Sequence, residues 1–402
     1  MGCEPRRARR RCLAAAALTA AALGLAAVPA LAASRHRSSA VSMAYGPMGP
    51  SSGSGGRWWW PPLPLRLTAV ASSPSTRTLA ISRGRAGWLR PLTGSFRPLR
   101  SAGAGPARAV AMAAGGEGCI VLRSGRTVFL GPGGRLLGTA QLPGGPAPAG
   151  TAVALAAGAG GPLAVVATPR GLVALRPGRP ANTLLRGDAT AVVPPAATRH
   201  PWWALVGGEL AWSRSGTSWA PVPRAPRFAA STHVLAALVD GTVLVAEPSG
   251  LVWSRTGQGW ARVLQLLPAG GLSSVPEPTA LQAVNVSSAY LATDGFGALL
   301  TPDDGYGWYR AAPSQLPATV DLLATVGPVR SATRPRGLVL AAGPRGLSVH
   351  ALQPLPTPPA YQGATQTAEE LGTAAVTLAA IALAAGALWL GSRRRPGTGA
   401  TV

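Results

Sequence analysis

The sequence contains no lysine, so all 37 of its basic residues are arginine. P-loop NTPases, pyridoxal enzymes and Schiff-base aldolases each need a lysine amine, and these classes are therefore excluded. Charged residues make up only 12% of the 402 residues, whereas glycine (52) and proline (40) are abundant. This balance does not fit a charged, helix-rich enzyme and favours a fold with many turns.

Cysteine is also scarce, with three residues at positions 3, 12 and 119. Cys3 and Cys12 lie in a predicted signal peptide, so the mature chain keeps only Cys119. A single cysteine cannot form an intramolecular disulfide. The fold must therefore be stabilised by a hydrophobic core, which a domain of this size can bury without difficulty.

Residues 1–32 have the pattern of a secretory signal peptide. Five arginines between positions 6 and 11 precede an apolar stretch from Cys12 to Leu31, and the small residues Ala30 and Ala32 flank its end. A basic region, an apolar region and a small-residue exit together predict cleavage after Ala32. An uncleaved first membrane helix is the alternative.

An uncharged run over residues 371–391 is predicted to be a transmembrane helix. At 1.5 Å per residue it is long enough to cross a hydrocarbon core of roughly 30 Å. Three arginines at 393–395 follow it and indicate the cytoplasmic side. The sequence therefore predicts a single-pass type I cell-membrane protein whose basic tail, 392–402, is cytoplasmic. A buried helix of the globular domain is the alternative.

Low-complexity segments flank the central part of the chain. Residues 33–63 are rich in glycine and serine and contain three consecutive tryptophans at 58–60, which we expect to dock on the domain. Residues 356–370 are rich in proline, threonine and glutamine. Both segments are interpreted as linkers, the second as a stalk above the membrane.

Between these linkers, over residues 64–355, one pattern recurs seven times: a short apolar strand, a polar turn that ends in glycine, and a second strand. The seven glycines lie 37 to 49 residues apart. Glycine fits this place because tight hairpins require a positive φ. The glycines are Gly84, Gly125, Gly171, Gly208, Gly250, Gly297 and Gly346.

Three copies carry a second hairpin in which glycine and tryptophan are three residues apart. Residues 210–220 and 251–261 match nearly residue for residue, and residues 299–309 form a more distant copy. The shared positions of the first two copies are Trp212, Gly216, Trp219, Trp253, Gly257 and Trp260.

Strand units of 40 to 50 residues cannot bury both faces alone, and the usual solution is to stack four-stranded blades radially. We therefore predict an all-β fold, a seven-bladed β-propeller over residues 64–355. A tandem of β-sandwich domains is the alternative, but it would show strand spacing without a long period.

Residues 301–308 resemble an Asp-box, the S/T-x-D-x-G-x-x-W hairpin of the BNR repeat propellers. That family includes sialidases, sortilin-like receptors and photosystem assembly factors. The resemblance implies that Thr301 and Asp303 hydrogen-bond inside a turn completed by Gly305, and that Trp308 packs between blade strands. These roles are structural and not catalytic.

The two sister hairpins depart from this motif. Arg214 and Arg255 stand where the motif has aspartate, so only the Gly-x-x-Trp half is kept. The resemblance therefore bears on the fold and leaves the activity open.

Little in the sequence points to catalysis. Sialidases of this scaffold use an arginine triad, a Tyr–Glu pair and an aspartic acid, and the nearest match to their first arginine motif, around Arg97, lacks an apolar residue. No spacing among the ten acids between residues 33 and 368 singles out a facing pair. The four histidines are dispersed, so no zinc pattern exists. We predict no catalytic residue, no metal and no cofactor.

From residue 33 to 368 the chain has 29 arginines and 10 acids, a net charge of +19. Outside the membrane such a field concentrates anionic partners, so we expect a protein or an anionic cell-envelope polymer. Nucleic acid is not expected, because no RNP-like or helix-turn-helix pattern is present. The alternative is that the arginines are solvated and reflect the coding bias of a GC-rich genome.

The sequence therefore predicts a membrane-anchored, extracytoplasmic propeller that acts as a non-enzymatic binding or assembly module. The alternative is a sialidase-like glycoside hydrolase acting on acidic sugars. Two acids and several arginines at the central channel would favour the enzyme, whereas their dispersion over different blades would favour the module.

Overall fold

The computed structural model describes residues 59–351 apart from the segments 74–76, 92, 101–104, 159, 197–198, 257–258, 268–274, 285–286, 311–318 and 328–336. The predicted signal peptide, most of the first linker, the stalk, the transmembrane helix and the basic tail lie outside the described residues. No helix within the described part is long and apolar enough to span a membrane.

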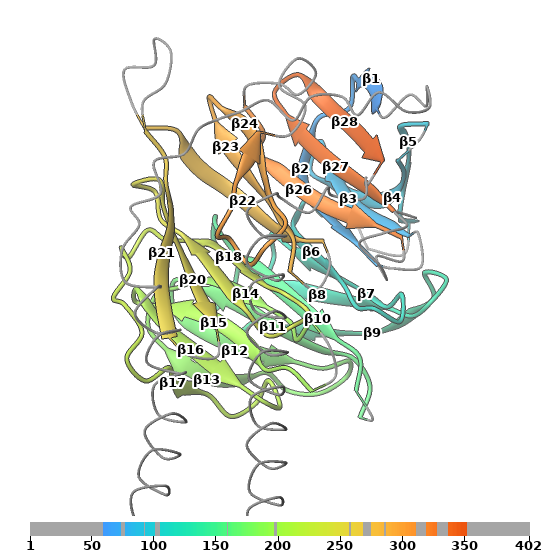
Figure 1. Ribbon diagram of the computed structural model, residues 1–402. Coiled ribbons are helices and arrows are strands. Elements are labelled where there is room, and N and C mark those ends of the chain that lie inside the picture. The colour runs from blue at the N-terminus through green and yellow to red at the C-terminus, as the bar shows by residue number, and fades with distance from the viewer. Residues whose placement is uncertain are drawn as a thin grey trace, which may run out of the picture.

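The described residues form seven four-stranded antiparallel sheets arranged around a common centre (Figure 1). The strands of the first four sheets are β2–β5 (Leu67–Ser72, Thr78–Ser82, Arg85–Arg90, Ser95–Pro98), β6–β9 (Ala107–Met112, Gly118–Leu122, Arg126–Leu130, Leu136–Gln141), β10–β13 (Ala152–Ala156, Leu163–Thr168, Gly171–Leu175, Asn182–Arg186) and β14–β17 (Ala189–Val193, Trp202–Val206, Glu209–Ser213, Ala220–Pro221). The other three are β18–β21 (Val234–Ala237, Val243–Ala246, Leu251–Thr256, Gly259–Gln265), β22–β25 (Glu277–Ala283, Ala289–Asp294, Gly297–Thr301, Tyr309–Arg310) and β26–β28 (Leu322–Val326, Leu338–Gly343, Gly346–Ala351) with β1 (Trp59–Leu63). The predicted all-β, seven-bladed propeller is confirmed.

The first strand of each blade lies innermost. Each of these strands, β2, β6, β10, β14, β18, β22 and β26, contacts the first strand of the next blade, and β26 contacts β2. All seven begin on one face of the disc, which we name the start face, and finish on the other, the end face. The start face carries the hairpins between second and third strands and the links between blades. The end face carries the other two hairpins of each blade.

The seven recurring glycines lie in the hairpins between second and third strands, and all have positive φ, from 74° at Gly84 to 133° at Gly171. Five of them, Gly125, Gly171, Gly208, Gly250 and Gly346, also let the chain around the fourth strand come close. A Cβ at Gly171 would collide with the carbonyl oxygen of Leu185, and one at Gly346 with that of Leu63. Glycine is therefore required at these positions for two reasons: the turn needs a positive φ, and neighbouring backbone lies too close for a Cβ.

Strand β1 closes the ring by pairing with β28, with Trp59 opposite His350 and Leu63 opposite Leu347. Figure 1 shows the blue β1 beside the orange β28. The linker predicted over 33–63 thus overlaps the propeller at its last five residues. β1 was not predicted from the sequence because the strand contains Pro61 and Pro62, and proline is unusual in strands. Proline is tolerated at sheet edges, and β1 is the outermost strand of its sheet.

The core lies between neighbouring blades. The middle strands are buried on both faces, as in β3, β7, β11 and β12. One cluster joins Cys119 and Phe129 of the second blade to Leu155 and Val166 of the third. Burial raises the pKa of the Cys119 thiol. Small alanine and valine side chains let these sheets pack closely, which explains a core built with few aromatic residues.

Gly207 and Gly208 of the fourth blade both have a positive φ, but only Gly208 lies close to other backbone, so substituting each one separates the cost of the turn from the cost of the steric clash. Gly208→Ala should lower the free energy of unfolding by about 3 kcal/mol, because a left-handed φ costs about 1–2 kcal/mol and a Cβ would also strike the carbonyl of Phe228. Gly207→Ala has the same φ problem but open space, and should cost about 1 kcal/mol. Denaturant unfolding of the purified full-length protein measures both, and equal losses would contradict the steric role.

Candidate functional site: the channel and its charged rim

The inner strands of all seven blades line a cavity of about 820 Å³. Its lining continues past the ends of these strands into the loops of the end face. Alanine and valine make up most of the wall. Its polar side chains are Ser72, Arg176, Arg214, Ser215, Gln282 and Thr325, and no aspartate or glutamate is among the described residues that line it.

Backbone groups add polarity to this wall. Each first strand is hydrogen-bonded within its sheet only to the second strand, so in the described part of the chain its other edge faces the channel. An edge of this kind carries N–H and C=O groups free to pair with a ligand. A few side chains cross between blades, since Ser72 Oγ donates to the Thr325 carbonyl and Gln282 Nε2 donates to Thr325 Oγ1 at 3.3 Å.

Two arginines lie at the end-face rim of the channel. Arg176 follows β12 and donates to the carbonyls of Gly160 and Gly161 at 3.3 and 3.2 Å. Arg214 follows β16, with its guanidinium carbon 5.9 Å from the ring centre of Trp212. Among the described residues, no arginine lies within salt-bridge distance of a carboxylate. Both charges are therefore free to attract an anionic group.

The turn of the sixth-blade hairpin is closed by hydrogen bonds among its own residues. Thr301 Oγ1 donates to Asp303 and accepts from the Gly305 N–H, both at 3.0 Å, and Asp303 Oδ1 accepts from the Gly307 N–H at 2.6 Å. Trp308 is only 4% exposed and packs in the core between the fifth and sixth blades. Burial raises the pKa of Asp303, whereas the hydrogen bonds from Gly307 and Thr301 act to lower it. These residues hold the hairpin and do not face the channel.

The sister hairpin of the fourth blade is one residue shorter, which changes the expected correspondence. Ser213 Oγ accepts from the Gly216 N–H at 2.9 Å, as Thr301 does in the sixth blade. Ser215 Oγ accepts from the N–H groups of Thr217 and Ser218, as Asp303 does from Gly307. Ser215, not Arg214, therefore takes the aspartate position. Aligning the hairpins on their glycine and tryptophan placed Arg214 at the aspartate position instead. Arg214 takes no part in closing the turn and lies at the channel rim.

The fifth-blade copy is a plain hairpin in which Arg255 pairs with Trp260, and Gly257 lies outside the described residues. Trp212, Trp253 and Trp260 are partly buried and pack between the fourth and fifth blades. In the fourth blade Trp219 Nε1 donates to the Gly216 carbonyl at 3.1 Å and closes the turn.

Hydrogen bonds between blades that were not predicted from the sequence lie at the start-face end of the channel. Four first strands carry a register shift near their start, at positions 68, 108, 190 and 279. Thr190 and Thr279 use it to donate to the carbonyls of Thr232 and Val320, in the links between blades. The only sequence signal is a polar residue before alanine, which is too common to identify such bulges.

The residues that could have formed an enzymatic centre are dispersed. None of Arg97, Asp188, Glu209, Asp240, Glu277, Tyr290 and Asp321 lines the channel. Burial raises the pKa of Tyr290 to about 12, which does not suit a nucleophile at neutral pH. Within the described residues, no three His, Cys, Asp or Glu side chains are grouped so as to hold a metal ion.

Two carboxylates do approach each other, Asp240 of the fifth blade and Asp304 of the sixth. Asp304 has a φ of 60°, and its carbonyl accepts from Ser254 Oγ at 2.7 Å. Burial, followed by repulsion from Asp240 and Asp303, raises the pKa of Asp304 to about 7. Asp240 is occupied by the N–H and Oγ1 of Thr242, at 2.8 and 3.0 Å. The pair lies at a joint between blades, outside the channel lining.

No protein-family model matches this sequence, and no curated protein matches it significantly. Solved structures show the same fold. They include YCF48 bound to a D1 peptide (16% identity, TM-score 0.53, covering 76% of this chain and 98% of that one). A chain of the mitotic checkpoint complex is also similar (11% identity, TM-score 0.54, 72% and 90%), as is virginiamycin B lyase from Staphylococcus aureus (10% identity, TM-score 0.50, 72% and 96%). Because these neighbours include an enzyme and binding proteins, the similarity establishes the propeller and not the activity.

The Asp304 carboxyl should make the stability of the propeller depend on pH. Its pKa is higher in the folded chain than its ordinary 3.8, so folding takes up a proton and stability is lost as pH rises from about 4 to 7. Asp304→Asn should flatten this decline and raise the melting temperature at pH 8 by roughly 2 °C, since asparagine also tolerates the positive φ. Calorimetry over pH 4–8 measures this, with the exposed Asp188→Asn as control. A wild-type profile that is flat from pH 4 to 7 would contradict the assignment.

Proposed function

We propose that this protein is a non-enzymatic binding module, anchored by the helix at 371–391, whose end face binds a protein partner outside the cytoplasm. The observation that carries the proposal is the channel wall. It combines free strand edges, small side chains and two arginines without ion pairs, and its described residues include no carboxylate. A wall of this kind can hold a polypeptide segment but supplies no acid or base for group transfer.

The known neighbours support this proposal at the level of the scaffold. YCF48 was solved with a D1 peptide, and another chain of this fold belongs to the mitotic checkpoint complex. The positive charge of the chain adds electrostatic attraction for an acidic partner. The sialidase-like alternative has no comparable support, because the candidate acids and Arg97 do not line the channel.

Photo-crosslinking in native membranes tests where the partner binds. A benzophenone amino acid at Ser215, on the channel rim, should give a discrete crosslinked product, whereas one at Arg97, on the outer strand β5, should not. Arg176→Ala combined with Arg214→Ala should reduce the Ser215 product about thirtyfold, since each of the two charge–charge contacts contributes about 1 kcal/mol. Equal products from both positions, or hydrolysis of acidic sugar substrates by the purified protein, would overturn the proposal.

The orientation has its own test. Green fluorescent protein fused after Val402 should fluoresce in cells, because the tail is expected to be cytoplasmic, whereas alkaline phosphatase at the same point should be inactive. The reverse pattern would place the tail outside and remove the propeller from its proposed compartment.

A further inference from the structure

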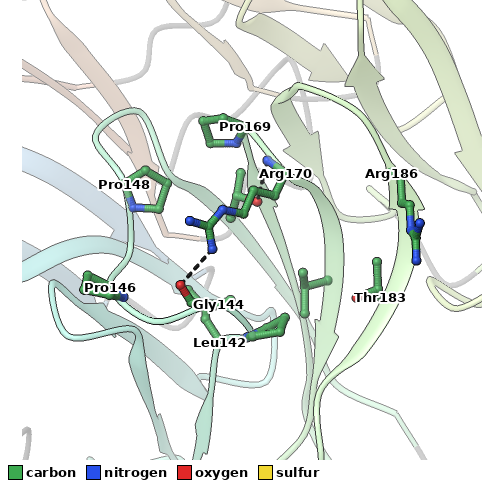
Figure 2. A pocket seen from close by; sticks show the side chains of 11 residues that line it. Leu142, Gly144, Pro146, Pro148, Pro169, Arg170, Thr183 and Arg186 are labelled. Atoms are coloured by element: carbon green, nitrogen blue, oxygen red, sulfur yellow. Dashed lines mark hydrogen bonds between the residues drawn. The ribbon is translucent and has the colours of Figure 1, made fainter.

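A second cavity, of about 370 Å³, lies between the second and third blades at the start face, away from the rim that carries Arg176 and Arg214. Figure 2 shows its walls. One is the link between the two blades, residues 142–148. The others are the hairpin at 168–170 and the outer strand β13, which contributes Thr183 and Arg186. Four prolines line the pocket, and none of the described lining residues is an acid.

The linking loop is held in place before any ligand arrives. The Leu142 N–H donates to the Gly125 carbonyl and the Ala147 N–H to the Arg123 carbonyl, both at 3.0 Å. Thr151 Oγ1 donates to the Pro148 carbonyl at 2.7 Å. Proline residues fix the backbone between these anchors. A wall that is already ordered lowers the entropy lost on binding.

Arg170 is positioned over this pocket by the same loop. Its Nη1 donates to the Gly144 carbonyl at 2.7 Å, and its backbone N–H donates to Thr168 Oγ1 at 3.2 Å (Figure 2). Gly144 has a φ of 82°, and a Cβ there would collide with Nη1. One bond therefore fixes the guanidinium while its other N–H donors stay available. Arg186 supplies a second positive charge from β13.

The fixed guanidinium of Arg170 has no carboxylate partner among the described residues and can bind an anion, and the planar fork of arginine fits a carboxylate best. Leu142 and Val173 make part of the pocket lining apolar. The volume is near the lower limit for ligand pockets and suits one or two side chains. β13 is the last strand of its sheet, so its outer edge can pair with an extended chain.

We propose that this pocket is a second binding site, which takes a glutamate or aspartate side chain carried on an extended segment of a partner protein. Arg170 binds the carboxylate, Arg186 adds positive charge from β13, Leu142 and Val173 contact a neighbouring apolar side chain, and β13 offers its edge to the backbone. This site is independent of the proposed channel site, because the two lie on opposite faces and share no lining residue.

A labelled peptide tests the chemistry directly. The probe is a capped peptide of sequence Thr-Glu-Val-Glu-Thr-Glu-Val, and its control has glutamine in place of each glutamate. Fluorescence anisotropy with the full-length protein in detergent should show binding of the acidic peptide alone, weakening as salt rises. Arg170→Ala should weaken binding about tenfold and Arg170→Lys less, since lysine keeps the charge but loses the fork.

Matched variants keep the proposal falsifiable. Arg179→Ala removes an exposed charge from the same blade at the other face and should leave the affinity unchanged, as should Arg176→Ala with Arg214→Ala. Gly144→Ala should weaken binding although both arginines remain, provided that its melting temperature shows a folded protein. If Arg170→Ala and Arg179→Ala lowered the peptide affinity equally, the effect would come from the net charge of the protein and not from the pocket, and the proposal would be overturned. Equal displacement by glucuronate or inorganic phosphate would also overturn it, by assigning the pocket to small anions.

Discussion

The propeller depends on one contact between distant parts of the chain, the pairing of β1 with β28. Every other sheet is formed by consecutive strands, but the last sheet needs a strand from the beginning of the propeller. Gly346 makes the contact possible, because any side chain there would collide with the Leu63 carbonyl. Both the channel and the pocket between blades require a closed ring, since their walls come from separate blades whose spacing the ring fixes.

The described arginines of this fold have no carboxylate partners to neutralise their charge. The guanidinium groups of Arg255 and Arg262 lie 5.2 and 4.9 Å from the ring centres of Trp203 and Trp253, and others donate to carbonyl groups. Such contacts place an arginine without cancelling its charge. The repulsion that results is tolerable because the charges are spread over seven blades and are solvated. A surface of this kind remains able to attract anions, whatever the origin of its arginine content.

The sequence was sufficient to predict the blades because their signal is local. A positive φ at a tight turn selects glycine, and seven such glycines at regular intervals identified seven hairpins. Two features escaped for physical reasons. β1 contains prolines that only an edge strand accepts, and the fourth-blade hairpin lost a residue while serine replaced aspartate as its acceptor. The cavities could not be predicted at all, because residues such as Gly144 and Arg170 meet only after the blades pack.

The placement of the two cavities bears on what a binding protein of this shape can do. The channel rim lies on the end face and the proline-lined pocket on the start face, so one compact partner cannot cover both. Arg176 and Arg170 nonetheless stand on the same sheet, at opposite ends of β12. The four strands of that sheet are hydrogen-bonded to one another in chain order, which sets the spacing between the sites. Two partners held on opposite faces would therefore be held at a set spacing, which is the property required of an assembly module rather than of a simple receptor.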